Sequence, residues 1–350
     1  MQHMNIIFYI ISILLLLFTS CKKEEQPIVQ IDAQQGFYVV NEGNFTWGNS
    51  SLSFYDEQKN TVESDIFYKM NGVPLGDVAM DMKIINNKGF ITVNNSGMIY
   101  VVEPNNAKHV ATITNFTSPR FILPINDSIA YVSDLYSPYI SIINTKNFQN
   151  VGQIFVGRST ETMLLWKNKV FACNWSFGSK VYVMDALQHR CIDSIQVGLQ
   201  PNSICIDKNE TIWVLCDGGY YGNPVCHEIS SLWKINPYTF HATKQLTFPS
   251  LNYPAKSLAI NNSLDSLYFI WNDVYKYSIS DTLFPQTAFV NSNGANFYHI
   301  SIHPYKPEII ICNAKNYTSN GEISIWSING QLIGKKMVGI NPGTICFITQ

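Results

Sequence analysis

The sequence predicts an all-β fold, a seven-bladed β-propeller, from three observations. The first is a series of short runs rich in Ile, Val, Phe and Tyr, bounded by Asn, Asp, Ser and Pro, which are typical of antiparallel strands joined by turns. The clearest series is Ser118–Asn144, SPRFILPINDSIAYVSDLYSPYISIIN. The second observation is that this unit recurs at a regular spacing, and the third is that one strand is left over at the C-terminus.

The spacing of the repeat can be counted from the residue that opens the first strand of each unit. These residues are Pro119, Thr160, Pro201, Pro254, Tyr298 and Pro342, and a matching opening lies near Val78. The steps from Pro119 onward are 41, 41, 53, 44 and 44 residues. A period of about 40–45 residues with four short strands per unit is the signature of propeller blades.

Composition limits the class of protein. The chain has 350 residues, of which 46% are hydrophobic and 14% charged, and its net charge is −2. It is therefore long enough to bury a large core and too apolar to be disordered. A near-neutral chain without a cluster of Lys and Arg is not expected to bind nucleic acid.

The N-terminal segment is predicted to be a targeting signal rather than part of the fold. Residues 1–20 contain an apolar run, Ile6–Phe18, that is short for a membrane span. Phe18-Thr19-Ser20-Cys21 resembles the lipobox of bacterial lipoproteins, in which Cys21 would carry the lipid; an ordinary signal peptide with a chance cysteine is the alternative. Residues 21–35 would be a tether, and residues 36–350 the propeller.

The predicted strands follow in order along the chain. Blade 1 receives Phe37–Val40, Ser51–Tyr55 and Thr61–Phe67; blade 2 receives Val78–Ile85, Gly89–Asn94, Met98–Glu103 and Val110–Thr114; blade 3 receives Arg120–Ile125, Ile129–Ser133, Tyr139–Asn144 and Val151–Val156. Blade 4 receives Glu161–Trp166, Lys169–Asn174, Lys180–Asp185 and Cys191–Val197; blade 5 receives Asn202–Asp207, Thr211–Cys216, Ser231–Ile235 and Ala242–Thr247. Blade 6 receives Lys256–Ile260, Ser266–Trp271, Asp273–Ser278 and Gln286–Val290; blade 7 receives His299–His303, Glu308–Asn313, Glu322–Ser327 and Leu332–Val338. No stretch shows sustained helical periodicity.

Blade 1 has only three strands in this assignment, and the C-terminal run Thr344–Thr349 has no blade of its own. We therefore expect the C-terminal strand to become the innermost strand of blade 1. This pairing would close the ring and remove an open sheet edge.

The loops differ between the two faces of the predicted ring. Loops that join second to third strands, such as Asn41–Ser50 and Asp217–Ser230, are long, whereas the opposite turns, such as Asn86-Asn87-Lys88, are minimal. Function is usually carried by loops on a rigid scaffold, so the elaborate face, here named the loop face, is the expected site. Its candidate ligand-binding residues are Trp47, Arg120, Asp134, Tyr136, Glu161, Trp175, Asn202, Asp217 and Tyr220.

Several of these residues have a structural alternative. Arg120 could pair with Asp134 or Glu161 across neighbouring blades instead of binding a ligand. Glu161, Asn202 and Asp217 could imitate the calcium ligands of a lactonase-like propeller, although such a site belongs to six blades. The chain has no nucleophile elbow, P-loop or Cys-x-x-Cys, so no catalytic residue, cofactor or metal is predicted.

The cysteines raise one structural question. Cys216 and Cys226 bracket the longest loop, and a disulfide between them would staple it in an exported protein. Cys191 is a further possible partner.

The sequence also resembles a known family. The motifs that carry the resemblance occur in order along the chain: Asn41-Glu42-Gly43-Asn44, Ser118-Pro119-Arg120, Tyr131-Val132-Ser133-Asp134-Leu135-Tyr136, Thr160-Glu161, Asn174-Trp175, Gln200-Pro201-Asn202-Ser203, Leu215-Cys216-Asp217-Gly218-Gly219-Tyr220 and Val338-Gly339-Ile340-Asn341-Pro342-Gly343. Together they look like the YncE-like, seven-bladed surface lipoproteins of Bacteroidota, and specifically their BtuG-type cobalamin-binding members.

The resemblance implies a non-enzymatic protein of the outer-membrane surface, attached by its lipid anchor only. It would capture a corrinoid such as vitamin B12, or another large polar small molecule, and pass it to a TonB-dependent outer-membrane transporter. Two alternatives come from other classes: a surface scaffold that binds a protein or a glycan, and a lactonase-like hydrolytic propeller.

Overall fold

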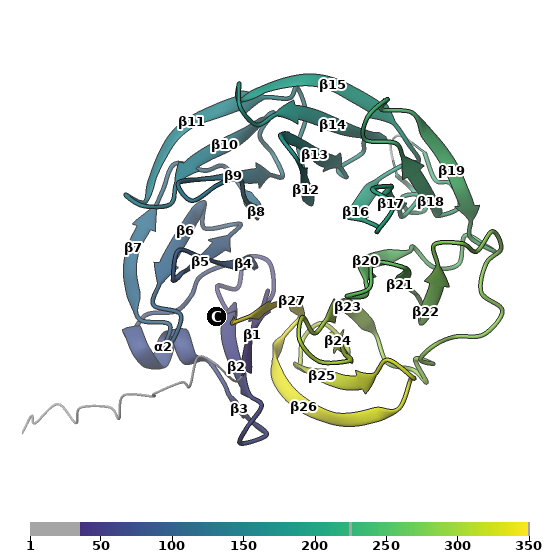
Figure 1. Ribbon diagram of the computed structural model, residues 1–350. Coiled ribbons are helices and arrows are strands. Elements are labelled where there is room, and N and C mark those ends of the chain that lie inside the picture. The colour runs from purple at the N-terminus through teal and green to yellow at the C-terminus, as the bar shows by residue number, and fades with distance from the viewer. Residues whose placement is uncertain (1–35, 224–225, 349–350) are drawn as a thin grey trace, which may run out of the picture.

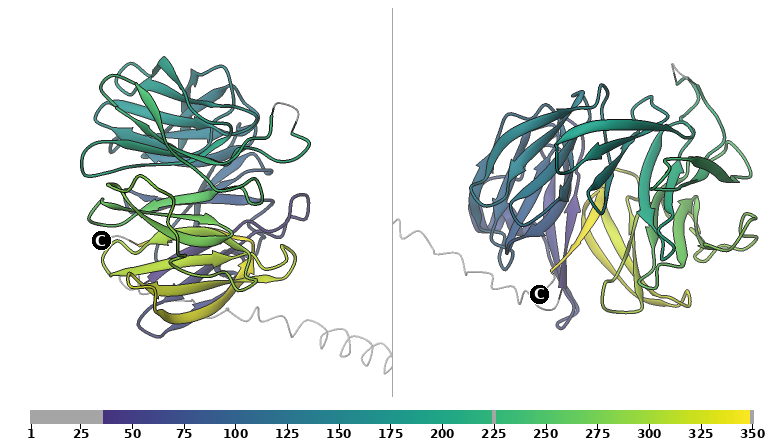
Figure 2. Two further views of the ribbon diagram at one scale, coloured as in Figure 1. Left: turned by 90° about the vertical axis from the view of Figure 1, so that its right-hand side faces the viewer. Right: turned by 45° about the horizontal axis from the view of Figure 1, so that its top comes forward.

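Seven antiparallel sheets surround a common axis in the computed structural model, which describes residues 36–223 and 226–348 (Figure 1). The innermost strands face the axis, and the chain passes outward through each sheet before it enters the next one. The predicted all-β class and the count of seven blades are therefore confirmed. A side view and a tilted view show the sheets arranged around the ring, with the loop between the second and third strands of blade 5 standing out from it (Figure 2).

The strands of the first four blades, innermost first, have the following bounds. Blade 1 holds β27 (Pro342–Phe347), β1 (Gly36–Asn41), β2 (Ser51–Asp56) and β3 (Thr61–Glu63); blade 2 holds β4 (Ala79–Ile85), β5 (Lys88–Val93), β6 (Met98–Val102) and β7 (His109–Ile113). Blade 3 holds β8 (Pro119–Pro124), β9 (Ile129–Asp134), β10 (Tyr139–Asn144) and β11 (Gln149–Phe155); blade 4 holds β12 (Met163–Trp166), β13 (Lys169–Asn174), β14 (Lys180–Asp185) and β15 (Arg190–Gln196).

The strands of blades 5, 6 and 7 are given in the same order, and blade 6 has three strands in place of four. Blade 5 holds β16 (Pro201–Ile206), β17 (Ile212–Cys216), β18 (Ser231–Ile235) and β19 (Ala242–Thr247); blade 6 holds β20 (Lys256–Ile260), β21 (Ser266–Trp271) and β22 (Asp273–Ser278); blade 7 holds β23 (Phe297–Ile302), β24 (Glu308–Asn313), β25 (Asn320–Ser327) and β26 (Leu332–Ile340).

The C-terminal strand closes the ring as the sequence predicts. β27 pairs antiparallel with β1, and Phe37 lies opposite Phe347 while Tyr38 lies opposite Cys346. The two strands lie side by side near the axis in Figure 1. The backbone groups on this edge of β1 are thereby paired. Blade 1 thus contains strands from both ends of the chain, and the chain enters it directly from blade 7.

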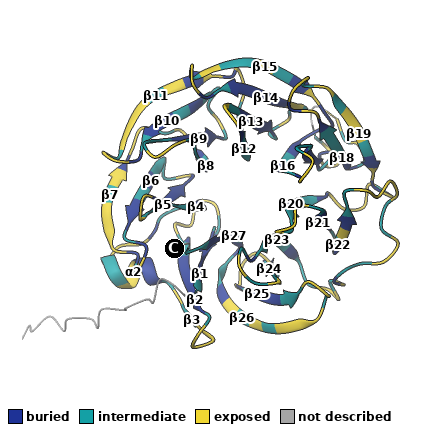
Figure 3. Cartoon of the chain, viewed as in Figure 1, coloured by how far each residue is buried: buried dark blue, intermediate teal, exposed yellow. Residues whose placement is uncertain are grey.

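The core is divided among the contacts between neighbouring blades. Buried residues concentrate on the inner and middle strands, while outermost strands such as β11 and β26 carry much of the exposed surface (Figure 3). Between blades 5 and 6, for example, Trp213 is fully buried and its Nε1 donates a hydrogen bond to Asp207 at 2.8 Å. A buried indole N–H needs such a partner, so this bond lets a large apolar side chain fill the sheet interface.

Polar side chains also join the innermost strands of neighbouring blades to one another. In each case a side chain in one inner strand, or directly before it, bonds the backbone of the next: Asp81 to Ile122 N (3.0 Å), Thr162 to Asn202 O (3.1 Å), Ser203 to Leu258 N (3.0 Å), Ser257 to Ile300 N (2.8 Å) and Thr344 to Met80 O (2.9 Å). Because these bonds lie around the axis, they fix the inner strands where a central site would be.

One predicted outer strand is wrong, and another is shorter than predicted. In blade 6, Gln286–Val290 forms no strand, and Val290 makes only an isolated bridge to Val274. Pro285 has no N–H to donate to a ladder. Phe284 packs instead against aromatic rings, including Tyr275 at 4.8 Å between centroids.

In blade 1, the strand predicted over Thr61–Phe67 ends at Glu63 and gives way to a short helix, α2 (Ile66–Asn71). Ile66 and Phe67 are fully buried, and the Phe67 ring lies 4.8 Å from that of Tyr100. The helix thus turns two adjacent apolar residues inward, which a strand cannot do because its side chains alternate. In the part of the chain that is described, no helix is both long and apolar enough to cross a membrane.

Candidate functional site

Irregularities at the start of the inner strands build the site. The pairing of each of these strands with its neighbour slips near the loop face in blades 1, 2, 3, 5, 6 and 7. The residues passed over by the pairing include Gly343, Met80, Arg120, Asn202, Ser257 and Tyr298. A β-bulge redirects side chains, and all six residues line one cavity at the loop-face end of the axis.

This cavity, here named the mouth, has a volume of about 400 Å³. Five of the nine predicted ligand-binding residues line it, namely Arg120, Glu161, Trp175, Asn202 and Asp217. The volume lies within the range of small-molecule sites, and the lining combines apolar side chains with a few polar groups. The structure thus brings together residues that lie up to about a hundred positions apart in the sequence.

Arg120 and Glu161 form an ion pair in the wall of the mouth. Arg120 Nε lies 2.9 Å from both carboxylate oxygens of Glu161, and Arg120 Nη1 contacts Met80 Sδ at 3.0 Å. Both side chains are largely buried, at 15% and 5% exposure. Burial alone would lower the pKa of Arg120, but the Glu161 carboxylate raises it. Of the two partners considered for Arg120, the structure therefore selects Glu161.

Trp175 and Asp217 form the second polar contact. Trp175 Nε1 donates to Asp217 Oδ2 at 2.6 Å, and the Gly219 N–H donates to Oδ1 at 2.8 Å. Burial raises the pKa of Asp217 to about 6, although these hydrogen bonds oppose the shift. The indole of Trp175 is thus held at the edge of the mouth by a carboxyl group behind it.

Glu42, Lys256 and Tyr298 complete the mouth, and none was among the nine predicted residues. The Tyr298 hydroxyl donates to Glu42 Oε2 at 2.8 Å. Burial raises the pKa of Glu42 to about 7 and lowers that of Lys256 to about 8. A signal for Lys256 was present, because it opens an inner strand as Arg120 and Asn202 do. It lies two residues after its proline, Pro254, while the other two follow theirs directly.

The other four predicted residues lie outside the mouth. Asp134 is buried, and its carboxylate accepts hydrogen bonds from the backbone N–H groups of Thr117, Ser118, Tyr136 and Ser137. Its oxygens therefore hold two loops in place. Trp47, Tyr136 and Tyr220 are exposed at 76%, 66% and 53% on loops of the same face. They belong to a set of exposed aromatic side chains on the loop face, here named the aromatic rim.

The axis is also hollow below the mouth. A second cavity of about 440 Å³ shares Phe121, Thr162, Ile204, His299 and Thr344 with the first. His299 lines both cavities. Burial lowers the pKa of its imidazole to about 4, so the ring is neutral at pH 7. The lower cavity is lined largely by apolar side chains, together with the ion pair of Lys83 and Asp81, whose charges satisfy each other at 3.0 Å.

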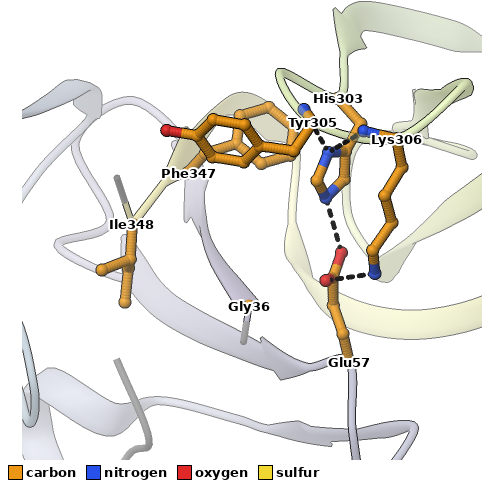
Figure 4. Close-up of a pocket in the computed structure, with 7 residues that line it drawn as sticks. All are labelled: Gly36, Glu57, His303, Tyr305, Lys306, Phe347 and Ile348. Carbon is orange, nitrogen blue, oxygen red and sulfur yellow. Dashed lines mark hydrogen bonds and ion pairs between the residues drawn. The ribbon is translucent and has the colours of Figure 1, made fainter. Parts of the chain in front are cut away.

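A third cavity, of about 480 Å³, lies where blade 7 meets blade 1 (Figure 4). His303 Nδ1 accepts the backbone N–H groups of Tyr305 and Lys306, so its Nε2–H donates to Glu57 at 2.9 Å. Lys306 Nζ also reaches Glu57. These groups satisfy one another, and they clamp the turn after β2 to the turn after β23 beside the closing strand.

The predicted disulfide is wrong. Cys216 and Cys226 are both free thiols in the structure. Cys216 is fully buried at the end of β17, where it packs with Cys173 and Val214 between blades 4 and 5, while Cys226 is exposed on the loop. A side chain that fills the sheet core cannot also reach out to a surface loop. The proposed lipid site, Cys21, lies outside the described residues.

The fold and the mouth define a class of protein, a seven-bladed β-propeller with a polar cavity at the loop-face end of its axis. Residues 35–341 match the family described as a domain of unknown function, DUF5074, and the chain belongs to that family. No curated protein matches the sequence.

Solved propellers have a similar fold. The quinonprotein alcohol dehydrogenase-like protein of Bacteroides thetaiotaomicron has a TM-score of 0.69 and 16% identity, with coverage of 91% of this chain and 79% of that one. The periplasmic gluconolactonase of Pseudomonas aeruginosa has a TM-score of 0.63 and 8% identity, with coverage of 89% and 98%. A dihydro-heme d1 dehydrogenase has a TM-score of 0.63 and 8% identity, with coverage of 93% and 77%. At these identities the likeness concerns the fold alone.

Within residues 36–223 and 226–348, no group of three or more His, Cys, Asp or Glu side chains is placed to hold a metal ion. The oxygens that would imitate a calcium set are also engaged. Glu161 pairs with Arg120, Asp217 accepts from Trp175, and Asn202 Oδ1 accepts from Ser203 at 2.6 Å. A cation at this position would have to displace the guanidinium of Arg120.

Proposed function

We propose that this protein is a non-enzymatic capture protein that binds a corrinoid, or a similarly large polar small molecule, over the mouth. The observation that carries the proposal is the convergence of an amide, a cation, carboxyl groups and an indole on one cavity inside a rim of exposed aromatic rings. Such a set can hydrogen-bond and stack on a ligand that is not highly charged.

The aromatic rim supports a ligand wider than the cavity. Its members are exposed aromatic side chains on loop-face loops of blades 1, 3, 4, 5 and 7: Phe45, Trp47, Tyr136, Phe177, Tyr220, Tyr221 and Tyr317. A corrinoid is too large to enter a cavity of about 400 Å³. It would lie across the rim with its planar ring against aromatic faces, while one of its arms enters the mouth.

The scaffold supports tight binding because it is already formed. The bonds between inner strands and the closure of β27 on β1 fix the residues of the mouth before a ligand arrives. A preformed site loses little conformational entropy on binding, so more of the contact energy appears as affinity. In this proposal the N-terminal segment anchors the protein through Cys21 at the outer-membrane surface, and the cargo passes to a TonB-dependent transporter.

Calorimetry with cyanocobalamin tests the proposal. We expect a saturable heat with one site per chain and a dissociation constant of about 1 µM or lower, the range in which a capture protein is useful. Arg120→Met, which removes a wall of the mouth, should weaken binding, and Tyr305→Ala on the opposite face serves as the control. The absence of heat at micromolar protein would contradict the corrinoid assignment.

A glycan is the second candidate ligand, favoured by one observation. Tyr221 and Trp47 are 94% and 76% exposed, so they stand clear of the mouth and could stack on sugar rings. Binding to a glycan array that is lost in a Trp47→Ala, Tyr221→Ala double variant, without any response to cyanocobalamin, would favour the scaffold function.

A further inference from the structure

Lys256 is the charged group of the mouth that lacks a partner. Arg120 is paired with Glu161, Asp217 accepts the indole of Trp175, and Glu42 accepts the hydroxyl of Tyr298. Within the described part of the chain, Lys256 Nζ makes neither a hydrogen bond nor an ion pair, and its recorded contact is the Tyr298 ring, 5.3 Å to the centroid.

The backbone holds Lys256 in this position. Lys256 pairs with Ile270, and the register of β20 then slips before Ala259, so the bulge begins directly after the lysine. The two bulge residues are tied to different blades: Ser257 Oγ accepts Ile300 N at 2.8 Å, and Leu258 N donates to Ser203 Oγ at 3.0 Å. The start of the Lys256 side chain, which lines the mouth, is thus fixed from both sides.

The neighbouring carboxyl groups are not bonded to this ammonium. Glu161 is paired with Arg120. Glu42 accepts the hydroxyl of Tyr298, and although its charge opposes the lowering of the Lys256 pKa by burial, no hydrogen bond or ion pair joins the two side chains in the described part of the chain. An ammonium group has three N–H donors and no acceptor, and a partly buried one is stabilised when an anion supplies the missing acceptors. The mouth therefore carries one ammonium group whose N–H donors are free to bond an anion of the ligand.

We propose that Lys256 receives an oxyanion of the bound ligand, a phosphodiester or a carboxylate, inside the mouth. This inference rests on the proposed function, because it states which part of the captured molecule enters the cavity. A lysine fits a single charged group as a point charge, whereas the paired guanidinium of Arg120 has its Nε committed to Glu161.

The first test compares two corrinoids by calorimetry, cyanocobalamin, which has a phosphodiester, and dicyanocobinamide, which lacks it. The wild-type protein should bind cyanocobalamin about 10-fold or more tightly than dicyanocobinamide, the scale of one charge-assisted hydrogen bond. Lys256→Met should reduce this preference to about 2-fold or less, because it weakens cyanocobalamin binding far more than dicyanocobinamide binding, and Lys256→Arg should retain part of the preference. Equal weakening of both corrinoids, or of neither, would overturn the inference.

A second test does not depend on corrinoid binding. Acetylation of Lys256 by an activated ester is followed by mass spectrometry in the wild-type protein, with the exposed Lys208 as the internal reference. Inorganic phosphate and acetate, added separately at several times their dissociation constants, should slow the reaction at Lys256 by about 3-fold or more relative to Lys208. Protection by either anion supports an oxyanion site and identifies its class; protection by neither overturns it. If cyanocobalamin fails to bind while phosphate protects, the proposed ligand is wrong and the anion site stands.

Discussion

Arg120 Nε, on the innermost strand of blade 3, lies 2.9 Å from both carboxylate oxygens of Glu161 at the start of blade 4. The pair links two blades and forms one wall of the mouth. Arg120→Met would leave a nearly buried carboxylate without its counter-charge, and such removal typically costs about 3–5 kcal/mol. We expect the free energy of unfolding to fall by about 3 kcal/mol in urea titrations at pH 7.5.

The matched control is an exposed ion pair. Lys208 and Asp265 are 53% and 36% exposed at a separation of 3.4 Å. Lys208→Met should change the unfolding free energy by less than about 1 kcal/mol, because water already screens that pair. Similar losses in the two variants would show that the Arg120–Glu161 pair contributes no more than a surface contact.

Trp175 should act on binding rather than on stability. Its indole lies at the mouth and is anchored by one hydrogen bond to Asp217. Trp175→Ala should weaken cyanocobalamin binding by about 1–3 kcal/mol, as expected for an aromatic side chain at the centre of an interface. Trp175→Phe retains a ring but loses the hydrogen bond to Asp217. Its affinity for cyanocobalamin should lie between those of the wild-type protein and Trp175→Ala. A lower melting temperature with unchanged affinity would assign Trp175 to the core instead.

Glu42 should make stability depend on pH. Burial raises its pKa from 4.5 to about 7 in the folded protein, so the folded state holds this proton more tightly than the unfolded state. The resulting stabilisation is complete below pH 4.5 and is lost as the pH rises through 7. Glu42→Gln cannot ionise at this position. The difference in unfolding free energy, variant minus wild type, should therefore become more positive by about 1–3 kcal/mol as the pH rises from 4.5 to 7.5. A difference that stays constant across this range would contradict the assignment.

The C-terminal strand should be needed for a stable ring. A chain that ends at Asn341 lacks β27, which exposes the edge of β1 and the buried side chains of Val39 and Tyr38. We expect loss of the cooperative thermal transition by circular dichroism, and association through the open edge in size-exclusion chromatography. A chain that ends at Ile348 is the control and should melt like the full-length protein.

The architecture could be predicted from the sequence because the strands of a propeller blade are consecutive in the chain. Each four-stranded unit repeats the same pattern of apolar runs and turns, and the unpaired C-terminal run had one vacancy to fill, beside Phe37–Val40. Blade 6 departed from prediction because apolar character alone does not distinguish a strand from a loop that packs through Phe284.

The site was accessible only in part. Arg120 and Asn202 directly follow prolines that open inner strands, so counting the repeat placed them at the mouth. Lys256 was missed because it lies two residues after Pro254 instead of directly after it, and the bulge that follows it in β20 leaves no reliable mark in a single sequence. Asp134 belongs to the same motif as Tyr136, yet its carboxylate accepts hydrogen bonds from backbone N–H groups. This role could not be predicted, because it depends on how two loops pack together.

Hydrogen–deuterium exchange with and without cyanocobalamin tests most directly whether the mouth is the capture site. We predict slower exchange on the loop face, in residues 42–50, 118–121, 174–178, 217–223 and 254–258, and no change in the turns around Asn87, Glu57 and Tyr305 on the opposite face. Slower exchange on the opposite face alone, or on neither face at saturating ligand, would contradict the account.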